Sequence, residues 1–282
     1  MKKLLLLASL LIFACSSDDS SDTNGNNNTS SERLIESYTL HSIQTCETYG
    51  TFNTGNVTNC TYNNNNLITS FTTQFYEYSC FDGFIYYDEE TFNYEYFDGY
   101  LVVSFNDGVN QFDLDENGNI DTHNVAQSGV TYLYNLTYEN DYIVSLSGIN
   151  RYYEMQFTYE NGNLISIYTE DENGDIDEVS ITYTQYENKS KLFHPFYFSV
   201  VSYLPSQNLY GENNTNLPAT YIRNTYSSDG ELTNTYNKYY NYIFDDDGYV
   251  IFLEEGNYST DYQNPNIINN LIEKTFELTY TN

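Results

Sequence analysis

One unit recurs along the chain and constrains its fold more than any other feature. It consists of an aromatic-rich stretch, a polar turn with Asn, Asp or Gly, and a short aliphatic stretch. Asn-Gly and Asp-Gly pairs supply the positive φ angles that tight hairpin turns require. In residues 153–160 apolar and polar side chains alternate strictly, which is the period of a half-buried antiparallel strand. Copies of the unit occupy residues 60–71, 95–105, 136–146, 157–168 and 242–253.

The repetition predicts an all-β fold, a long antiparallel up-and-down meander of hairpins that forms an open or curled sheet with few or no helices. Short helices are expected only at 31–37 and 266–273, where apolar residues follow a helical spacing. We expect a single elongated domain over 33–282, with an aromatic-proline insertion at about 187–220 that interrupts the hairpin rhythm.

The N-terminus predicts export and a lipid anchor. Residues 1–14 have the charged, apolar and small-residue order of a secretory signal, and the apolar run is too short to span a bilayer. The Cys15 that follows Ile-Phe-Ala resembles a lipobox cysteine, which carries acyl chains such as palmitate. An ordinary signal with an incidental cysteine is the alternative. Residues 15–32 are almost entirely polar and predict a disordered acidic tether.

The tether also bears on location. Asp18 and Asp19 resemble the acidic export signal of surface lipoproteins in Bacteroidota, with a solvated charge pair as the alternative. We therefore expect a protein anchored in the outer membrane through Cys15, at the cell surface or else on the periplasmic face.

The net charge limits the classes of molecule that the protein can bind. The formal net charge is −31, and loss of Lys2 and Lys3 with the signal takes it to −33. Nucleic acid and anionic lipid surfaces are poor partners for such a chain, because both are bound through Lys and Arg. Divalent cations are favoured instead.

Three cysteines remain after Cys15. Export permits one disulfide, and the pair Cys46–Cys60 is the first choice because it would staple the polar stretch between them. Three free and partly buried thiols, Cys80 included, are the alternative.

Two acidic turns resemble calcium loops of the EF-hand kind. In residues 113–124 the ligand positions and the central glycine are filled, but the closing glutamate is missing. Residues 169–180 match more poorly, with Asp171, Asn173 and Asp177. A Ca²⁺ site is thus a hypothesis for the first loop, and a solvated hairpin turn is the alternative for both. Its ligands would be Asp113, Asp115, Asn117, Asn119 and Asp121.

The insertion at 187–220 concentrates aromatic residues between two prolines. A projecting loop could present Phe193, Phe196 and Tyr197 to a sugar or a protein partner. The alternative is a crossover that caps the sheet and fills its core, because large aromatic side chains are usually buried.

The sequence contains no recognisable set of catalytic residues. The nucleophile elbow, the zinc-protease helix and the phosphate loop have no match in the sequence. A pair of glycosidase carboxylates is defined by its separation in space, so none can be named among forty acidic residues. We expect a protein that is not an enzyme and that carries no cofactor, apart from the Ca²⁺ considered above.

The clearest repeat, residues 157–165, resembles the tyrosine-aspartate repeats of Rhs-type proteins. It also resembles a group of Bacteroidota surface lipoproteins, in which such units build a long β-meander after a lipobox and a polar tether. Residues 186–198 and 213–250 are similar to the aromatic-proline insertion of that group. The resemblance implies a meander fold and a lipid anchor, and it implies no established activity.

Two functions from different classes follow. The leading hypothesis is a non-catalytic binding module for a glycan or an envelope protein, in which rows of tyrosine offer stacking faces. The alternative is a structural envelope or spacer protein whose tyrosines pack across strands, and a calcium-stabilised adhesin-like module is a minor one. Exposed aromatic rows would favour binding, whereas buried tyrosines with Asn, Thr and Glu outward would favour the spacer.

Overall fold

A computed structural model describes the chain in sixteen β-strands. They belong to Arg33–Asn282, the second of two units into which the chain divides. The described residues are 33–46, 50–78, 85–105, 108–127, 130–149, 152–193, 209, 211–262 and 268–281. The strands are Ile35–Cys46 (β1), Gly50–Tyr62 (β2), Ile68–Tyr78 (β3), Ile85–Phe97 (β4), Tyr100–Phe105 (β5), Gly108–Leu114 (β6), Ile120–Gln127 (β7), Val130–Glu139 (β8), Tyr142–Gly148 (β9), Tyr153–Glu160 (β10), Asn163–Asp171 (β11), Ile176–Glu187 (β12), Asn216–Tyr226 (β13), Leu232–Phe244 (β14), Val250–Asp261 (β15) and Ile268–Tyr280 (β16).

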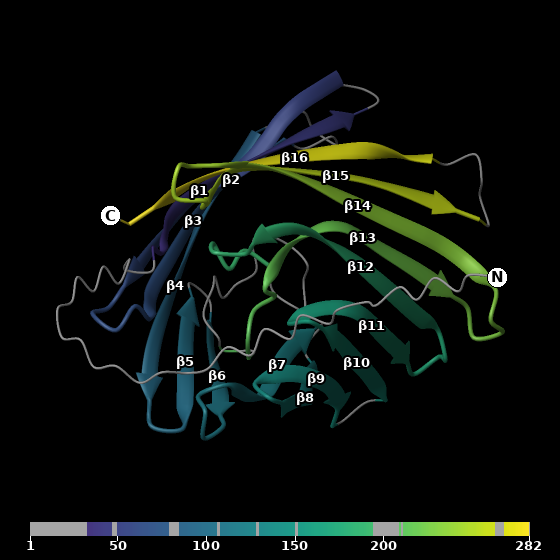
Figure 1. Ribbon diagram of the computed structural model, residues 1–282, viewed down its shortest axis with the longest axis horizontal. Coiled ribbons are helices and arrows are strands. Elements are labelled where there is room, and N and C mark those ends of the chain that lie inside the picture. Colours follow the sequence, from purple (N-terminus) through teal and green to yellow (C-terminus); the bar gives the residue numbers. More distant parts are fainter. Residues whose placement is uncertain are drawn as a thin grey trace, which may run out of the picture. The chain divides into compact units, whose positions relative to one another are not determined.

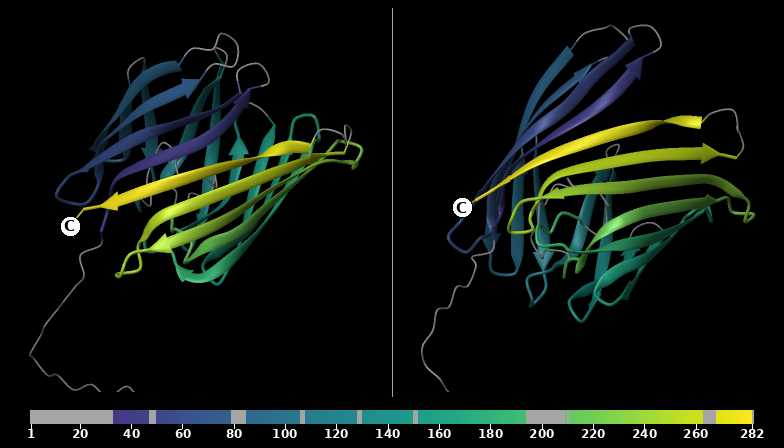
Figure 2. Two further views of the ribbon diagram at one scale, coloured as in Figure 1. Left: turned by 90° about the horizontal axis from the view of Figure 1, so that it is seen from above. Right: turned by 45° about the horizontal axis from the view of Figure 1, so that its top comes forward.

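The sheet is a closed barrel. Each strand pairs antiparallel with its neighbours in the chain, and β1 pairs with β16, as in Tyr38 opposite Leu278 (Figures 1 and 2). The predicted all-β antiparallel fold is therefore confirmed, and the predicted open or curled sheet is wrong. Closure pairs the two edge strands with each other, which removes the exposed backbone edges of an open meander.

Both short helices predicted from the sequence are also wrong. Residues 35–46 and 268–280 are strands β1 and β16, which pair with each other and with β2 and β15. A few apolar residues at helical spacing are a weak signal, and hydrogen bonding on both sides of a strand outweighs it. The described residues contain strands, turns and bends but no helix. Within this part of the chain no helical segment has the length and apolar character of a membrane span.

The barrel has two different ends. The turns after even-numbered strands share one end with Arg33 and Thr281, and we call it the terminal end. The turns after odd-numbered strands lie at the opposite end, which we call the far end. All five copies of the sequence unit are hairpins of the terminal end. Their turns use positive φ angles, as at Gly162 (75°) and Gly248 (84°).

The predicted insertion crosses the terminal end. Between β12 and β13 the structure describes residues 188–193, 209 and 211–215, which we call the crossing segment. Leu209 O accepts a hydrogen bond from Ile120 N at 2.6 Å, and Asn214 Oδ1 accepts one from Leu164 N at 2.7 Å. Ser190 Oγ accepts one from Val250 N at 3.1 Å. The described residues of the segment therefore bond to the first residues of β7, β11 and β15 at this end.

Tyrosines reinforce the same end from inside. Near the terminal end several buried or half-buried tyrosines each donate a hydrogen bond to a backbone carbonyl of another strand. Burial raises the pKa of Tyr138, Tyr183, Tyr242 and Tyr280 above the ordinary value, so these phenols stay neutral donors. The bonds are Tyr62 to Ile35 O (2.9 Å), Tyr138 to Ile120 O (2.7 Å), Tyr183 to Leu164 O (2.7 Å), Tyr242 to Pro218 O (2.7 Å) and Tyr280 to Val250 O (2.7 Å).

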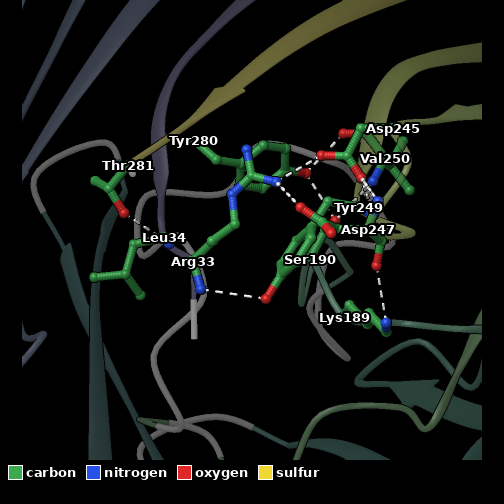
Figure 3. A network of polar contacts seen from close by, with 10 residues as sticks. All are labelled: Arg33, Leu34, Lys189, Ser190, Asp245, Asp247, Tyr249, Val250, Tyr280 and Thr281. Atoms are coloured by element: carbon green, nitrogen blue, oxygen red, sulfur yellow. Dashed lines mark hydrogen bonds and ion pairs between the residues drawn. The ribbon is translucent and has the colours of Figure 1, made fainter. Parts of the chain in front are cut away.

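Arg33 ties the start of the barrel to the β14–β15 turn (Figure 3). Its Nη1 lies 2.6 Å from Asp245 Oδ2 and 3.5 Å from Asp247 Oδ2. Its guanidinium carbon lies 5.0 Å from the ring centroid of Tyr249 and 5.3 Å from that of Tyr280. Arg33, the first described residue, is thus held by two acids and two aromatic rings at the terminal end.

Candidate functional site

The interior of the barrel changes character along its length. Toward the terminal end the inward side chains of β14 and β15 are aromatic or aliphatic, such as Tyr242 and Leu253. Toward the far end the inward positions of the same strands hold Lys238, Glu255 and Asn257. Because alternate residues of a barrel strand point inward, these polar groups share the interior with the apolar ones.

Three cations face the polar part of the interior from neighbouring strands. Arg223 on β13 pairs across the sheet with the buried Val179, and Lys238 on β14 pairs with the buried Asn257. Lys274 on β16 pairs with Glu255, which is also buried. We call Arg223, Lys238 and Lys274 the basic patch. The whole chain has nine Lys and Arg, two of them in the predicted signal, so this patch holds a large share of the positive charge.

The cations of the patch are unequally neutralised. Lys238 Nζ lies 3.2 Å from Glu255 Oε1, while Arg223 Nε is 3.8 Å from Asp177 Oδ1. Lys274 forms no ion pair within the part of the chain that the structure describes. Asp177 also accepts a hydrogen bond from Thr225 Oγ1. Lys238 therefore has a close buried partner, whereas Arg223 and Lys274 keep unsatisfied positive charge.

The charges of the other two cations act on Lys238. Burial lowers the pKa of Lys238, and the charges of Lys274 and Arg223 push it in the same direction. The Glu255 carboxylate opposes both effects. An additional negative charge in this place would therefore be stabilised by several cations at once.

Two tyrosines lie among the cations. Lys238 Nζ is 6.0 Å from the ring centroid of Tyr221 and 5.9 Å from that of Tyr236, and Arg223 Cζ is 5.9 Å from the Tyr236 centroid. Burial, with the Glu255 carboxylate nearby, raises the pKa of Tyr236 to about 12, although Arg223 opposes the shift. Both rings are therefore positioned for cation–π contacts.

The exposure of the inward charged side chains increases toward the far end. The exposed fraction of the side chain is 42% for Arg223 and 32% for Asp177, and it falls to 13% for Lys238 and 3% for Glu255. Arg223 and Asp177 lie closer to the far-end turns along their strands than Lys238 does. The charged inward side chains are therefore more exposed toward the far end, and beyond Glu255 the inward side chains of β14 and β15 are aromatic or aliphatic.

The acidic turn proposed for Ca²⁺ is the β6–β7 hairpin of the terminal end. Asp115 Oδ1 accepts backbone hydrogen bonds from Asn117 (2.8 Å) and Asn119 (2.9 Å), which is the geometry of a side-chain-stabilised turn. Asp113 and Asp121 are exposed. No group of three or more His, Cys, Asp or Glu suited to a metal occurs among the described residues. Ca²⁺ binding stays a prediction.

The second acidic turn, between β11 and β12, is built in the same way. Asp171 Oδ1 accepts backbone hydrogen bonds from Asn173 (2.8 Å) and Asp175 (3.1 Å). Asp177, one of the ligands considered for that loop, instead faces Arg223 in the interior.

The aromatic residues proposed for ligand binding divide in two. Phe193 is completely buried and packs edge-on against Tyr240, with ring centroids 5.2 Å apart. Its ring therefore belongs to the core, as in the alternative of a crossover that caps the sheet. Phe196 and Tyr197 lie outside the described residues, as does Cys15.

The structure separates the cysteines of the predicted disulfide. Cys46 ends β1 opposite Gly50, whereas Asn59, the residue before Cys60, pairs with Ser37 near the start of β1. The two cysteines thus lie at opposite ends of one hairpin, beyond the reach of a disulfide. Cys60 is a free buried thiol, and burial raises its pKa to about 12. Cys80 lies outside the described residues.

Sequence reasoning did not single out the basic patch. A signal was present, because Arg223, Lys238 and Lys274 each stand two residues from an aromatic residue of the same strand face, such as Tyr221, Tyr236 and Phe276. A cation at an inward position of an aromatic strand is unusual. The strand register that brings the three together could not be inferred from one sequence.

Fold and site together define a closed sixteen-stranded antiparallel barrel, filled at one end and charged inside at the other. No family model and no curated protein matches the sequence. A porin-like protein from Bacteroides uniformis ATCC 8492 is similar in structure, with a TM-score of 0.65 and 17% sequence identity over 88% of this chain and 98% of that chain. A porin-like protein from Bacteroides vulgatus ATCC 8482 has a TM-score of 0.49 and 13% identity, over 88% of this chain and 99% of that chain. At this level of identity the first likeness shows the barrel fold alone.

Proposed function

We propose that the chain is a non-catalytic envelope lipoprotein whose barrel stands in water and binds a ligand through its far end. On this view the acyl chains of Cys15 attach it to the outer membrane, and the barrel wall does not cross the bilayer. The observation that carries the proposal is the polarity of the outer face.

Whole strands are polar on the outside. The outward residues of β10, from Glu154 to Glu160, are all exposed and are two glutamates, a glutamine and a threonine. On β12 the outward residues Glu178, Ser180 and Thr182 are all exposed, and the exposed Tyr186 stands near the end of the strand. A membrane barrel carries an apolar outward band about 25 Å tall. These two strands offer no such band.

The middle of β4 is equally unsuited to lipid. Apolar outward residues occur only toward its two ends, and the stretch between them carries exposed acids and an amide. Hydrocarbon would meet the acids at the depth where charge is most costly. The exposed outward residues of β4 are, in order, Ile85, Tyr87, Glu89, Asn93, Glu95 and Phe97.

Ligand entry at the far end follows from the attachment point. The predicted tether would join the barrel at Arg33, in the terminal end, where the crossing segment bonds to β7, β11 and β15. The charged part of the interior lies toward the far end. On this proposal the protein is anchored at its terminal end, and the basic patch lies toward the other end.

A structural spacer is the second candidate, and the tyrosines favour it. Tyr38, Tyr94, Tyr134 and Tyr240 are buried, and Asn, Thr and Glu occupy many outward positions. Tyrosine rows thus pack the interior instead of forming a stacking face. The binding hypothesis is retained because the basic patch offers a different site.

Export without acylation tests the location of the barrel. Residues 1–15 are replaced by a cleavable signal that lacks a lipobox, and the full remaining chain is expressed in a bacterium with an outer membrane. We expect the protein in the soluble fraction without detergent, while the unaltered chain incorporates labelled palmitate and sediments with membranes. A non-acylated barrel that stays in carbonate-washed membranes would overturn the proposal.

A further inference from the structure

We infer that the interior around the basic patch binds a short acidic oligosaccharide, through its carboxylate or sulfate groups and its hydroxyls together. This inference deepens the proposed function and rests on it. Three observations carry it: the incompletely neutralised cations, the buried polar atoms without partners, and the exposure of the inward charged side chains, which increases toward the far end.

The cations of the basic patch would bind the acidic groups of the oligosaccharide. Arg223 is 42% exposed and its ion pair with Asp177 is long, at 3.8 Å. Lys274 is half-buried without an ion pair among the described residues. Arginine and lysine bind carboxylate and sulfate groups through charge-assisted hydrogen bonds. Two cations on β13 and β16, on either side of the Lys238–Glu255 pair, suit a ligand with more than one acidic group.

Some buried polar atoms near the patch need hydrogen-bond donors, which a simple anion cannot provide. Within the described residues, Arg223 Nε, Asn234 Oδ1 and Asn56 Oδ1 are buried and have no hydrogen-bond partner. A donor such as Nε fits an anion, but the two amide oxygens need donors. Sulfate and free carboxylate have none to give. A sugar that carries acidic groups and hydroxyls provides both kinds of partner.

The three polar atoms belong to the same inner wall as the patch. Asn234 pairs with Thr225, two residues from Arg223 along β13. Asn56 pairs with Leu40, two residues from Ser42 along β1, and Ser42 pairs with Lys274. The wall thus runs across β13, β14, β15, β16, β1 and β2. This width exceeds that of a single anion and suits a chain of a few sugars.

The charge of the whole molecule sets the specificity. The predicted mature chain carries −33, and Glu90 also faces the interior from β4, since it pairs with the buried Thr73. A long polyanion would be repelled along the outer wall. A short oligosaccharide that fits inside escapes this repulsion, so we expect binding in one place only.

Calorimetric titration of the full mature chain tests the inference. The probes are trigalacturonate, a chondroitin sulfate tetrasaccharide, a neutral galactose trisaccharide and sodium sulfate. We expect at least one acidic probe to bind with a stoichiometry of one, about ten-fold or more tighter than the neutral one, because charge-assisted hydrogen bonds are among the strong ones. Sodium sulfate at the same concentration should not compete.

Matched variants test whether the ligand binds at the basic patch. Arg223→Gln and Lys274→Gln should each weaken the acidic probe about ten-fold or more. Lys189→Gln removes the same charge at the terminal end and should leave affinity unchanged. Lys238→Gln is avoided, because it would leave the buried Glu255 without its partner. Thermal unfolding confirms that each variant is folded.

Several results would overturn the inference while the proposed location of the barrel survives. They are equal affinity for acidic and neutral probes, full competition by sulfate, unchanged binding in both patch variants, and the absence of heat with either acidic probe at millimolar concentration. Retention of the non-acylated barrel in membranes would instead overturn the proposed function, so the two failures are distinguishable.

Discussion

At the residue scale, the tyrosines of the repeat act as hydrogen-bond donors that lock strand ends. The residue triplet of an apolar residue, Thr and Tyr occurs at 60–62, 136–138, 157–159, 181–183 and 278–280. In each of these the first residue is buried, and in all except 157–159 the tyrosine hydroxyl reaches a carbonyl of a different strand. The hydroxyl of Tyr159 is buried without a hydrogen-bond partner among the described residues. The abundance of tyrosine thus has a structural cause, because phenylalanine could fill the same space but could not satisfy the carbonyl.

Tyr183→Phe tests this role. The change removes the bond to Leu164 O (2.7 Å) and leaves a carbonyl unpaired, so the free energy of unfolding should fall by about 1 kcal/mol. Tyr258→Phe is the control, because Tyr258 is an exposed tyrosine of the outer face. Urea unfolding of the two variants beside the parent gives the values. Equal effects in both would show that the hydroxyl of Tyr183 is not structural.

At the element scale, closure of the barrel depends on two features. One is the seam between β1 and β16, and the other is the crossing segment. Thr281 N donates to Leu34 O at 2.9 Å beyond the last paired residues of the seam. Tyr280 OH also lies 2.7 Å from Ser190 Oγ of the crossing segment. Arg33 adds a contact from the start of the seam to the β14–β15 turn. Four segments distant in sequence therefore converge at the terminal end.

Arg33→Met should lower the free energy of unfolding by roughly 1–2 kcal/mol at neutral pH, because a half-exposed ion pair and two cation–π contacts are lost. Arg33→Lys keeps the charge but loses the planar stacking. Its free energy of unfolding should therefore lie between those of Arg33→Met and the parent protein. Denaturant unfolding measures both. If Lys and Met were equally destabilising, the charge of Arg33 would have no role.

The same contact predicts a dependence on acid. Burial would raise the pKa of Asp245, but backbone amides of Tyr249 and Asp247 and the Arg33 guanidinium outweigh it and hold the pKa below 3.8. A carboxyl with a depressed pKa stabilises the fold above its unfolded value and loses that contribution as pH falls through the folded one. The difference in the free energy of unfolding between the parent and Arg33→Met should thus be largest at neutral pH. It should shrink as the pH falls and Asp245 becomes protonated.

At the scale of the whole molecule, burial of many phenols predicts loss of stability in alkali. Burial raises the pKa of Tyr38, Tyr94, Tyr183, Tyr242 and Tyr280 above the ordinary 10.0. The unfolded chain ionises first, so stability is complete below pH 10 and falls as pH rises from there toward the folded values.

A pH titration followed by phenolate absorbance and circular dichroism checks this expectation. The buried tyrosines should ionise together with cooperative loss of the β signal. Smooth ionisation of all tyrosines near pH 10 in a folded protein would contradict the burial described above.

The hairpins could be predicted because their signals are local. Asn161 and Gly162 have positive φ angles in the β10–β11 turn, as the Asn-Gly pair indicates, and the strand around Phe157 alternates as its sequence does. Closure could not be predicted. Tyr38 and Leu278 meet across the seam, and the alternation of each strand is the same in an open sheet and in a barrel.

The site was missed for a related reason. Arg223, Lys238 and Lys274 lie on three strands, and only the register places them on one inner wall. Phe193 was considered as an exposed binding residue because it lies in an irregular aromatic stretch. Burial of Phe193 depends on the space inside a barrel, which the predicted open sheet did not contain.

Closure through the first and last strands also governs when folding can finish. The thirteen residues of β16 are made after the other strands of the barrel, and until they are present both β1 and β15 have an unpaired edge. Neighbouring hairpins can form early, because their contacts are local, but the pairing that seals the barrel has a sequence separation close to the full domain. Such contacts make folding slow. The emerging chain must therefore remain protected from pairing with other copies until its final strand is complete.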